Sequence, residues 1–492
     1  MAFNLLPIEL NQEIAHYIDS DKDLCAFAAT CQETRNAVQS DGGSFWNRRF
    51  RSRFALEPGR HDNEVLRKKY QRRRKWLRRM SSISFKYGHG KREVKSMAVI
   101  TELINESFSG QVLYDEHGRR TCRNLDELSR FIETSTTLSK INEVSLPRYT
   151  SGTGVAGSYN WTLAAIQLMY SHVLFDNSRI WNEVYNFEHS QQMAYANAIE
   201  QPIFIGLDRQ LINMEFILHL MNFFRHHMMH KDESHALYEA YKELSAVQKP
   251  SAWDRKLKNH DQHIGNDWRG TYAYLEPQEV IAIRAITDGT NKKKKNTIFI
   301  DKNVDGSTGE CPIQSLHLDP VGMRSTDSDD SSTDGDKKPI LKSSTLPPNM
   351  LNMFSSILKA HPTPKEARTR AQHRTRSTTP PRKPQPISIE GEGKDDGTFY
   401  ASGWMSDVPA QENIEGWKRM SFIKYYTDSF GNVDQGALWG YEGVVLPGGK
   451  LCLGRWWAVE QEADEEWEED DELYSGPFIL WNVQAKTAPK EA

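Results

Sequence analysis

The first fifty residues constrain the fold most strongly, because they contain three short helical segments in succession. The run Leu5-Leu6-Pro7-Ile8-Glu9-Leu10 opens the first segment, and proline suits the first turn of a helix, where its missing N–H has no intrahelical partner. Leu10, Ile14 and Ile18 recur at four-residue spacing and predict one apolar stripe. Ser20 and the run Thr30-Cys31-Gln32-Glu33 predict the caps of the second and third helices. Helices of this length bury little core alone, so their apolar surface predicts packing against a partner.

The order Leu-Pro-x-Glu-Leu, followed by a closing tryptophan, resembles an F-box over residues 3–50. The sequence departs from the family pattern at 17–20, where an aliphatic pair and an Asp-Pro are common. The resemblance implies that a Skp-type adaptor, and through it a cullin, binds this segment. The alternative is an ordinary helical N-terminus whose leucines pack on their own chain. The residues that we expect at the adaptor are Leu5, Leu6, Pro7, Ile8, Glu9, Leu10, Ile14, Leu24, Cys31 and Trp46.

Length and composition predict a soluble protein of several domains. A chain of 492 residues exceeds one ordinary core, which favours two or three domains. No stretch approaches the continuous apolar length of a membrane helix, and the N-terminus lacks the order of a signal peptide, so no membrane partner is expected. The cysteines are scattered without paired spacing, which disfavours a disulfide framework or a zinc site. We therefore expect a reducing compartment, the cytoplasm and/or the nucleus.

The small net charge of -4 conceals strong segregation. Residues 47–79 hold fourteen Lys or Arg against three acids, and most of these charges fall in a predicted helix over 63–79. In F-box proteins a basic helix at this place links the box to the next domain. The alternatives are a nuclear-import signal or a phosphate-binding surface, and the lack of an aromatic stacking platform interleaved with these charges disfavours nucleic acid. Ten of the thirteen residues in 460–472 are acidic, which predicts an extended, self-repelling loop.

Apolar spacing and composition divide the chain into six parts. We predict an F-box over 1–50, a basic linker helix over 51–82, and a helical domain over 83–264. The first part of a β-domain follows over 265–324, then a disordered loop over 325–390, and the second part of the β-domain over 391–485. Periodicity predicts helices at Val94–Ile104, Leu125–Leu138, Trp161–Phe175 and Leu211–Phe224. Short β-branched or aromatic runs predict strands at Thr271–Leu275, Val280–Ile286 and Thr297–Ile300.

The C-terminal third has a clear strand pattern, in which Pro447-Gly448-Gly449 marks a turn. The run Gly265–Tyr272 loosely echoes Gly393–Phe399, which indicates that strands before and after the loop form one antiparallel assembly, a barrel or a sandwich. The fold class is therefore α+β. Residues 438–449, 454–457 and 475–481 are also similar to a family of fungal-type F-box proteins. The predicted strands are Thr398–Trp404, Met420–Tyr426, Leu438–Val445, Lys450–Trp457 and Phe478–Val483.

No pattern in the chain predicts a catalytic residue, a metal or a cofactor. His226, His227, His230 and His235 form the only metal-like group, yet the carboxylate of a zinc hydrolase is missing between them, and a solvated, polar helix end explains them better. The run 301–306 matches half of a calcium loop, but Pro312 stands where the bidentate Glu is required, so we interpret it as a β-turn. No phosphate-binding loop, nucleophile elbow or dinucleotide fingerprint is present.

The resemblance and the β-domain together predict a non-catalytic substrate receptor of an SCF-type ubiquitin ligase. Trp, Tyr and Arg dominate protein recognition, so we expect substrate contacts at Trp404, Trp417, Tyr441, Arg455 and Trp457, although core packing also explains their density. If all five are buried, the substrate site is expected on 93–247. The competing hypotheses are an F-box protein that works with the adaptor outside a ligase and an enzyme hidden in 83–320. The identity of the protein substrate is not predicted by the sequence.

Overall fold

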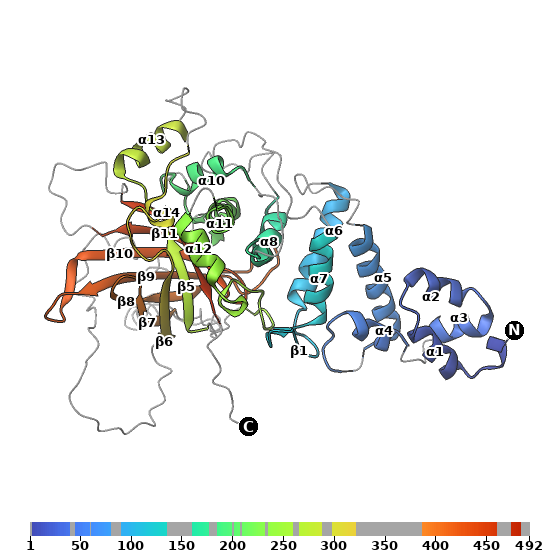
Figure 1. The fold of residues 1–492 in the computed structure, drawn as a ribbon. Coiled ribbons are helices and arrows are strands. Elements are labelled where there is room, and N and C mark those ends of the chain that lie inside the picture. The colour runs from blue at the N-terminus through green and yellow to red at the C-terminus, as the bar shows by residue number, and fades with distance from the viewer. Residues whose placement is uncertain are drawn as a thin grey trace, which may run out of the picture. The chain divides into compact units, whose positions relative to one another are not determined.

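The structure, a computed structural model, divides the chain into two compact units, each described separately below (Figure 1). The first unit comprises Met1–Thr137 with Asp254–Lys256, and the second comprises Leu138–Trp253 with Leu257–Ala492. The predicted acidic loop at 460–472 and most of the predicted disordered loop lie outside the described residues. The structure describes residues 2–39, 45–59, 61–79, 90–134, 160–176, 185–198, 201–206, 209–231, 235–258, 265–287, 298–320, 386–459 and 474–483.

Short helices fill the start of the first unit. A 3-10 turn, η1 (Ala2–Leu5), precedes α1 (Ile8–His16), α2 (Asp21–Ala28), α3 (Gln32–Gln39) and α4 (Phe45–Arg53). The predicted cap is present, because the Ser20 hydroxyl accepts a hydrogen bond from the Asp23 N–H at 3.3 Å. Trp46 is buried and donates from Nε1 to the Val38 carbonyl at 2.7 Å, which ties α4 to the end of α3. Three helices therefore occupy the range in which the sequence predicts them, and α4 adds a fourth.

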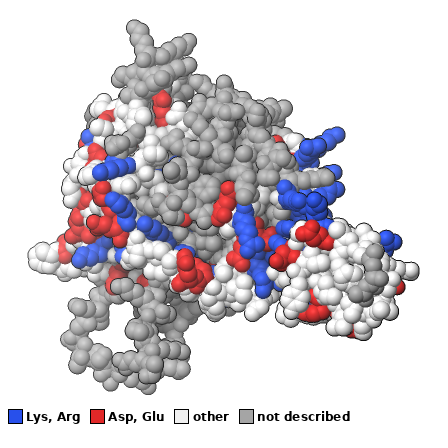
Figure 2. Space-filling model, turned by 45° about the vertical axis from the view of Figure 1, so that its right-hand side comes forward, with Lys and Arg blue, Asp and Glu red and all other residues white. Residues whose placement is uncertain are grey.

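The basic helix α5 (Asn63–Arg79) is a structural element of the first unit rather than a free linker. It packs between α4 and α6 (Lys91–Asn105), and α6 packs on α7 (Arg123–Thr134) after a short β1–β2 pair (Leu113–Tyr114 and Arg120–Thr121). Glu102 of α6 and Glu106, the residue that caps its C-terminal end, form ion pairs with Lys69 and Arg73 of α5. Figure 2 shows blue and red surface lying side by side over this unit. The unit therefore extends to Thr137, past the predicted boundary at residue 82.

The helices of the second unit surround α11 (Met214–Met229), which is buried on nearly every side. It contacts α8 (Trp161–Met169), α10 (Phe187–Ala194) and α12 (His235–Glu243), and it packs against two barrel strands (Figure 1). The smaller elements are α9 (Ser171–Leu174), β3 (Phe204–Ile205), β4 (Leu211–Ile212), η3 (Ala246–Gln248), α13 (Pro277–Thr287) and α14 (Lys302–Asp305). Within the described residues, no helix combines the length and the apolar character needed to cross a membrane.

Eight antiparallel strands close into a barrel in the order β10-β11-β12-β5-β6-β7-β8-β9. Strands β5 and β6 precede the long loop and pair with β12 and β7, which follow it. The prediction that strands before and after residues 321–385 form one antiparallel assembly is confirmed, and that assembly is a barrel; the loop predicted between them lies outside the described residues. The strands are β5 (Asp267–Tyr272), β6 (Gln314–Pro320), β7 (Ile387–Lys394), β8 (Thr398–Asp407), β9 (Lys418–Thr427), β10 (Val433–Val445), β11 (Leu451–Ala458) and β12 (Ser475–Asn482). Strand β7 begins inside the range predicted as loop.

Four local predictions are wrong. The run Val280–Ile286, predicted as a strand, lies in helix α13, because Pro277 starts the helix and Val280, Ile283 and Ile286 are buried at three-residue spacing. Residues 298–300 have no regular structure, and 301–306 contains the single helical turn α14, closed by Gly306 with a φ of 91°. The histidines of α11 are not solvated, since His226 and His227 are 5% and 3% exposed.

Candidate functional site

The clearest cavity in the second unit lies at one end of the barrel, and we call it the mouth cavity. Alternate residues of β9 point into the barrel, so that Met420, Phe422, Lys424 and Tyr426 form one inward series. Met420 and Phe422 belong to the packed interior, whereas Lys424 and Tyr426 line the cavity. The cavity has a volume of about 470 Å³. An eight-stranded barrel is wide enough to be filled by side chains or to hold one small ligand.

Stacked aromatic side chains separate the cavity from the packed interior. The rings of Phe422 and Tyr441 are nearly parallel, with centroids 4.7 Å apart, and Tyr441 also meets Phe478 edge-on at 5.1 Å. Tyr441 is 3% exposed, and it lines the cavity from β10. These three rings belong to the continuous core of the barrel and give the cavity a rigid floor.

Indole and phenol rings form the walls of the mouth cavity. Trp439 of β10 and Trp456 of β11 meet edge-to-face at 5.5 Å, and Tyr272 of β5 lies 5.5 Å from Trp456. Trp456 donates from Nε1 to the Ala273 carbonyl at 3.1 Å, which fixes its ring. Tyr274 completes this side with its ring 6.4 Å from that of Trp456. The walls therefore present aromatic faces and edges from β10, β11, β5 and the segment after β5.

A buried ion pair lies at one side of the cavity. Lys424 is 4% exposed, and its ammonium donates to Asp395 Oδ2 at 2.5 Å and to Gln314 Oε1 at 3.3 Å. Tyr426 donates to the same Asp395 oxygen at 2.7 Å. Burial opposes the charge of Asp395, but Lys424 and Tyr426 outweigh it and hold the pKa of that carboxyl below its ordinary value. Asp395 sits in the turn between β7 and β8, so a turn residue and a strand residue form the pair.

The tyrosines of the cavity are neutral hydrogen-bonding groups. Burial and a hydrogen bond to Glu310 raise the pKa of Tyr272, and burial and a hydrogen bond to Glu276 raise the pKa of Tyr274 to about 12. Burial also raises the pKa of Tyr441. Their phenols remain protonated at neutral pH. The formal charges at the cavity therefore come from carboxylates and Lys424.

Replacing Lys424 with Met is expected to destabilise the barrel by about 3 kcal/mol at neutral pH, because it leaves the Asp395 carboxylate half-buried without its cation. Asp395 has a lowered pKa in the folded chain, so its contribution is present above the unfolded pKa and is lost as pH falls through the lower folded pKa. The difference between wild type and variant should therefore shrink in acid. Urea unfolding at neutral and acidic pH measures the free energy of unfolding of wild type and variant. Lys394→Met, at an exposed position on β7, is the control. Equal loss in both variants would contradict the assignment.

The structure does not bring the five predicted substrate residues together. Tyr441 lines the mouth cavity, whereas Trp417 is fully buried. Arg455 points outward from β11, where it donates to the carbonyls of Ala196 at 2.7 Å and Gln201 at 2.9 Å. Trp404 and Trp457 are half-buried members of an outer aromatic cluster, and a Cβ at Gly440 would lie 2.4 Å from the Trp457 ring. Most of these residues therefore serve packing in the structure described here.

The ten predicted adaptor residues separate into a core set and a surface set. Leu24 and Trp46 are buried in the first unit, and Leu6, Ile14 and Cys31 are partly buried. The surface set is Leu5, Pro7, Ile8, Glu9 and Leu10, of which Leu5, Ile8 and Leu10 are 87%, 40% and 51% exposed.

Helix α1 leaves these aliphatic side chains outside because its smaller residues face inward. Asn11 and Ala15 are fully buried, and the Asn11 amide donates to the Phe3 carbonyl at 3.2 Å. The predicted stripe of Leu10 and Ile14 therefore lies beside the buried face rather than on it. The first helix exposes apolar surface that the first unit does not cover.

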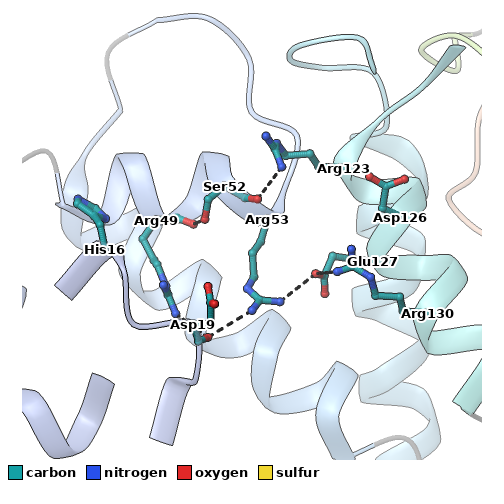
Figure 3. A pocket seen from close by; sticks show the side chains of 9 residues that line it. All are labelled: His16, Asp19, Arg49, Ser52, Arg53, Arg123, Asp126, Glu127 and Arg130. Atoms are coloured by element: carbon teal, nitrogen blue, oxygen red, sulfur yellow. Dashed lines mark hydrogen bonds and ion pairs between the residues drawn. The ribbon is translucent and has the colours of Figure 1, made fainter. Parts of the chain in front are cut away.

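A second cavity, of about 250 Å³, lies in the first unit and is strongly polar. Figure 3 shows that the arginine side chains lining this cavity point toward backbone and side-chain groups of the chain itself. Arg49 donates to the Ile18 carbonyl at 2.7 Å, Arg53 donates to Asp19 and Glu127, and Arg123 donates to the Ser52 carbonyl at 2.8 Å. Carbonyls at the ends of α1 and α4 are satisfied in this way. The cavity lies between helices of the first unit. Hydrogen bonds and ion pairs within the chain account for the charged side chains that line it.

The sequence indicated only part of the mouth cavity. The alternation along Met420–Tyr426 contains the signal that places Lys424 inside the barrel, whereas Glu310 and Asp396 lie on loops that no local pattern brings together. Within the described part of the chain, no group of three or more His, Cys, Asp or Glu side chains is arranged to hold a metal ion. A comparison of the chain with models of protein families, with curated proteins and with solved structures finds no match.

Proposed function

We propose that the chain is the substrate-recognition subunit of an SCF-type ubiquitin ligase. A Skp-type adaptor binds the helices of residues 3–50, a cullin joins through the adaptor, and the second unit captures a protein substrate. The chain contributes no reacting group to ubiquitin transfer. Holding the substrate beside the charged conjugating enzyme raises its effective concentration there, which is sufficient to accelerate transfer.

The observation that carries the proposal is the exposed aliphatic surface of η1 and α1. Leu5, Ile8 and Leu10 lie in solvent while Asn11 and Ala15 occupy the inward face of α1. Burying one such leucine in a partner is worth about 2–3 kcal/mol, so a partner that covers this surface gains that free energy for each residue. These residues belong to the Leu-Pro-x-Glu-Leu motif on which the F-box resemblance depends.

Substrate capture is assigned to the mouth cavity. It is a concave site with aromatic walls and few charged groups, which is typical of ligand-binding sites in barrels. Tyr441 is the member of the predicted substrate set that lines it. A protein substrate would insert a terminal or side-chain group, because a cavity of this volume admits one group rather than a folded surface.

Reconstitution with purified components tests the assignment. The full chain is mixed with a Skp-type adaptor and then with a cullin, and each complex is analysed by size-exclusion chromatography. Co-elution of all three supports the ligase subunit, and transfer of ubiquitin to a captured protein completes the test. Co-elution of the adaptor without the cullin favours an F-box protein acting outside a ligase. Failure to bind the adaptor overturns the proposal.

A further inference from the structure

The mouth cavity carries more negative than positive charge. Its charged lining groups are Glu310, Asp395, Asp396 and Lys424, so three carboxylates face one ammonium. Lys424 is neutralised within the structure, because it bonds to Asp395 at 2.5 Å. Glu310 and Asp396 supply the remaining charge, and both are exposed. A ligand entering the cavity therefore meets two negative charges that no ammonium of the lining offsets.

Aromatic rings give the same wall a preference for cations. The faces of indole and phenol rings carry negative electrostatic potential and attract a cation that lies over them. The cavity already holds one such contact, because the Lys424 ammonium lies 4.2 Å from the centroid of the Phe399 ring and 5.3 Å from that of Tyr426. Trp439, Trp456 and Tyr272 form a box of rings next to the carboxylate of Glu310, which accepts a hydrogen bond from the Tyr272 hydroxyl. The Lys424 ammonium also lies 5.7 Å from the centroid of the Tyr272 ring, so among the described residues the two indoles are the rings of this box without a lining cation over them.

We propose that the mouth cavity binds an organic cation carried by the protein substrate, with the charged group held between Trp439, Trp456 and the Glu310 carboxylate. This proposal rests on the proposed function, because the cation is taken to be a group of the protein substrate. Two side chains supply this chemistry: the guanidinium of arginine, which stacks on aromatic faces, and the methylated ammonium of lysine, which fills aromatic cages.

Other ligand classes fit the cavity less well. An anion would approach Glu310 and Asp396, and the ammonium that could offset them is already bonded to Asp395 and Gln314. A neutral apolar group would contact the rings but would displace water from Glu310 without offering a charge in return. A cation interacts favourably with both the aromatic rings and the Glu310 carboxylate.

Matched pairs of small probes separate charge from shape. Choline and 3,3-dimethylbutan-1-ol have the same shape and differ in charge, and N-acetylarginine amide and N-acetylcitrulline amide differ in the same way. Isothermal titration calorimetry of the full chain is expected to give a dissociation constant about tenfold lower for the cation than for its neutral partner in at least one pair. The pair with the larger ratio identifies the ammonium or the guanidinium as the preferred group.

Variants of the cavity test its location. Glu310→Gln retains a partner for Tyr272 and is expected to weaken cation binding about fivefold, whereas Glu390→Gln, at an exposed position on the outer side of β7, should leave it unchanged. Trp439→Leu should weaken cation binding about tenfold, and Trp439→Phe, which keeps a ring, should restore most of it.

The outcomes distinguish this proposal from the proposed function. Equal binding of cation and neutral partner, tighter binding of N-acetylglutamate amide, or equal effects of Glu310→Gln and Glu390→Gln would each overturn the cation site. Absence of binding by every probe would do the same. Adaptor binding is measured on the same preparation and depends on residues 3–50, so these results do not affect it. Failure to bind the adaptor would contradict the proposed function rather than the cation site.

Discussion

The double substitution Leu5→Ala with Leu10→Ala is expected to weaken adaptor binding at least a hundredfold. Both side chains are exposed in the free chain, at 87% and 51%, so their removal leaves no cavity in the first unit. In the complex each leucine would be buried, and truncating a buried leucine costs about 2–5 kcal/mol, where 1.4 kcal/mol corresponds to tenfold in affinity. Biolayer interferometry with immobilised adaptor measures the loss, and a thermal melt checks that the fold is kept.

The matched control removes aliphatic surface of the same kind elsewhere. Val65 of α5 and Ile281 of α13 are 60% and 43% exposed, and Val65→Ala with Ile281→Ala should bind the adaptor as wild type does. If Leu5→Ala with Leu10→Ala binds the adaptor with unchanged affinity, the F-box interpretation is wrong, because the exposed aliphatic residues of the first helix would then have no part in the complex.

The substitution Arg73→Ala is expected to destabilise the first unit by about 3–5 kcal/mol, because it removes the fully buried cation that bridges two carboxylates and leaves them only the partly exposed Lys69 and Arg72. Arg73 is fully buried and donates to Glu102 and Glu106 at 2.6 Å. Its guanidinium also lies 5.2 Å and 5.1 Å from the ring centroids of Phe50 and Phe54. Burial would raise the pKa of Glu106, but Arg73 and Lys69 outweigh it and lower that pKa, so the carboxylate is ionised while Arg73 is in place.

Arg72→Ala is the control for this prediction. Arg72 lies on the same helix and pairs with the same Glu102, but its side chain is 53% exposed, so its loss should cost less than about 1 kcal/mol. Chemical denaturation measures both variants. Hydrogen exchange locates the effect, with lost protection expected in α5 and α6 and none in the barrel strands. A loss no larger for Arg73→Ala than for Arg72→Ala would mean that the buried network is not what holds α5 to α6.

The basic helix shows why charge patterns alone do not assign function. Residues 63–79 are rich in Lys and Arg, which favours import signals and phosphate sites as readily as a structural helix. The acids that neutralise part of this charge come from α6, more than twenty residues along the chain, and from Asp21. Charge that looks unpaired along the sequence is therefore partly paired in three dimensions.

The sequence alone determined the structural elements that depend only on residues close to one another along the chain. The cap at Ser20, the order of the first helices, and the β-branched and aromatic runs of β8 to β12 each depend on neighbouring residues and could be predicted. A single antiparallel assembly, a barrel or a sandwich, was also predicted, because strands with apolar faces must bury them together, and the structure decided for the barrel. The family of the first fifty residues remains a prediction, since its test is a partner protein.

Tertiary structure decided the features that depend on contacts between distant segments. Val280–Ile286 contains β-branched residues suited to a strand, and burial at three-residue spacing against the other helices makes it a helix. His226 and His227 are polar in sequence and buried in the structure, where His226 stacks on Phe187 with centroids 3.7 Å apart. The mouth cavity joins Glu310, Asp395 and Trp456, which no local pattern relates. Closure of the barrel brings them together, because the pairing of its strands fixes which loops meet at its end.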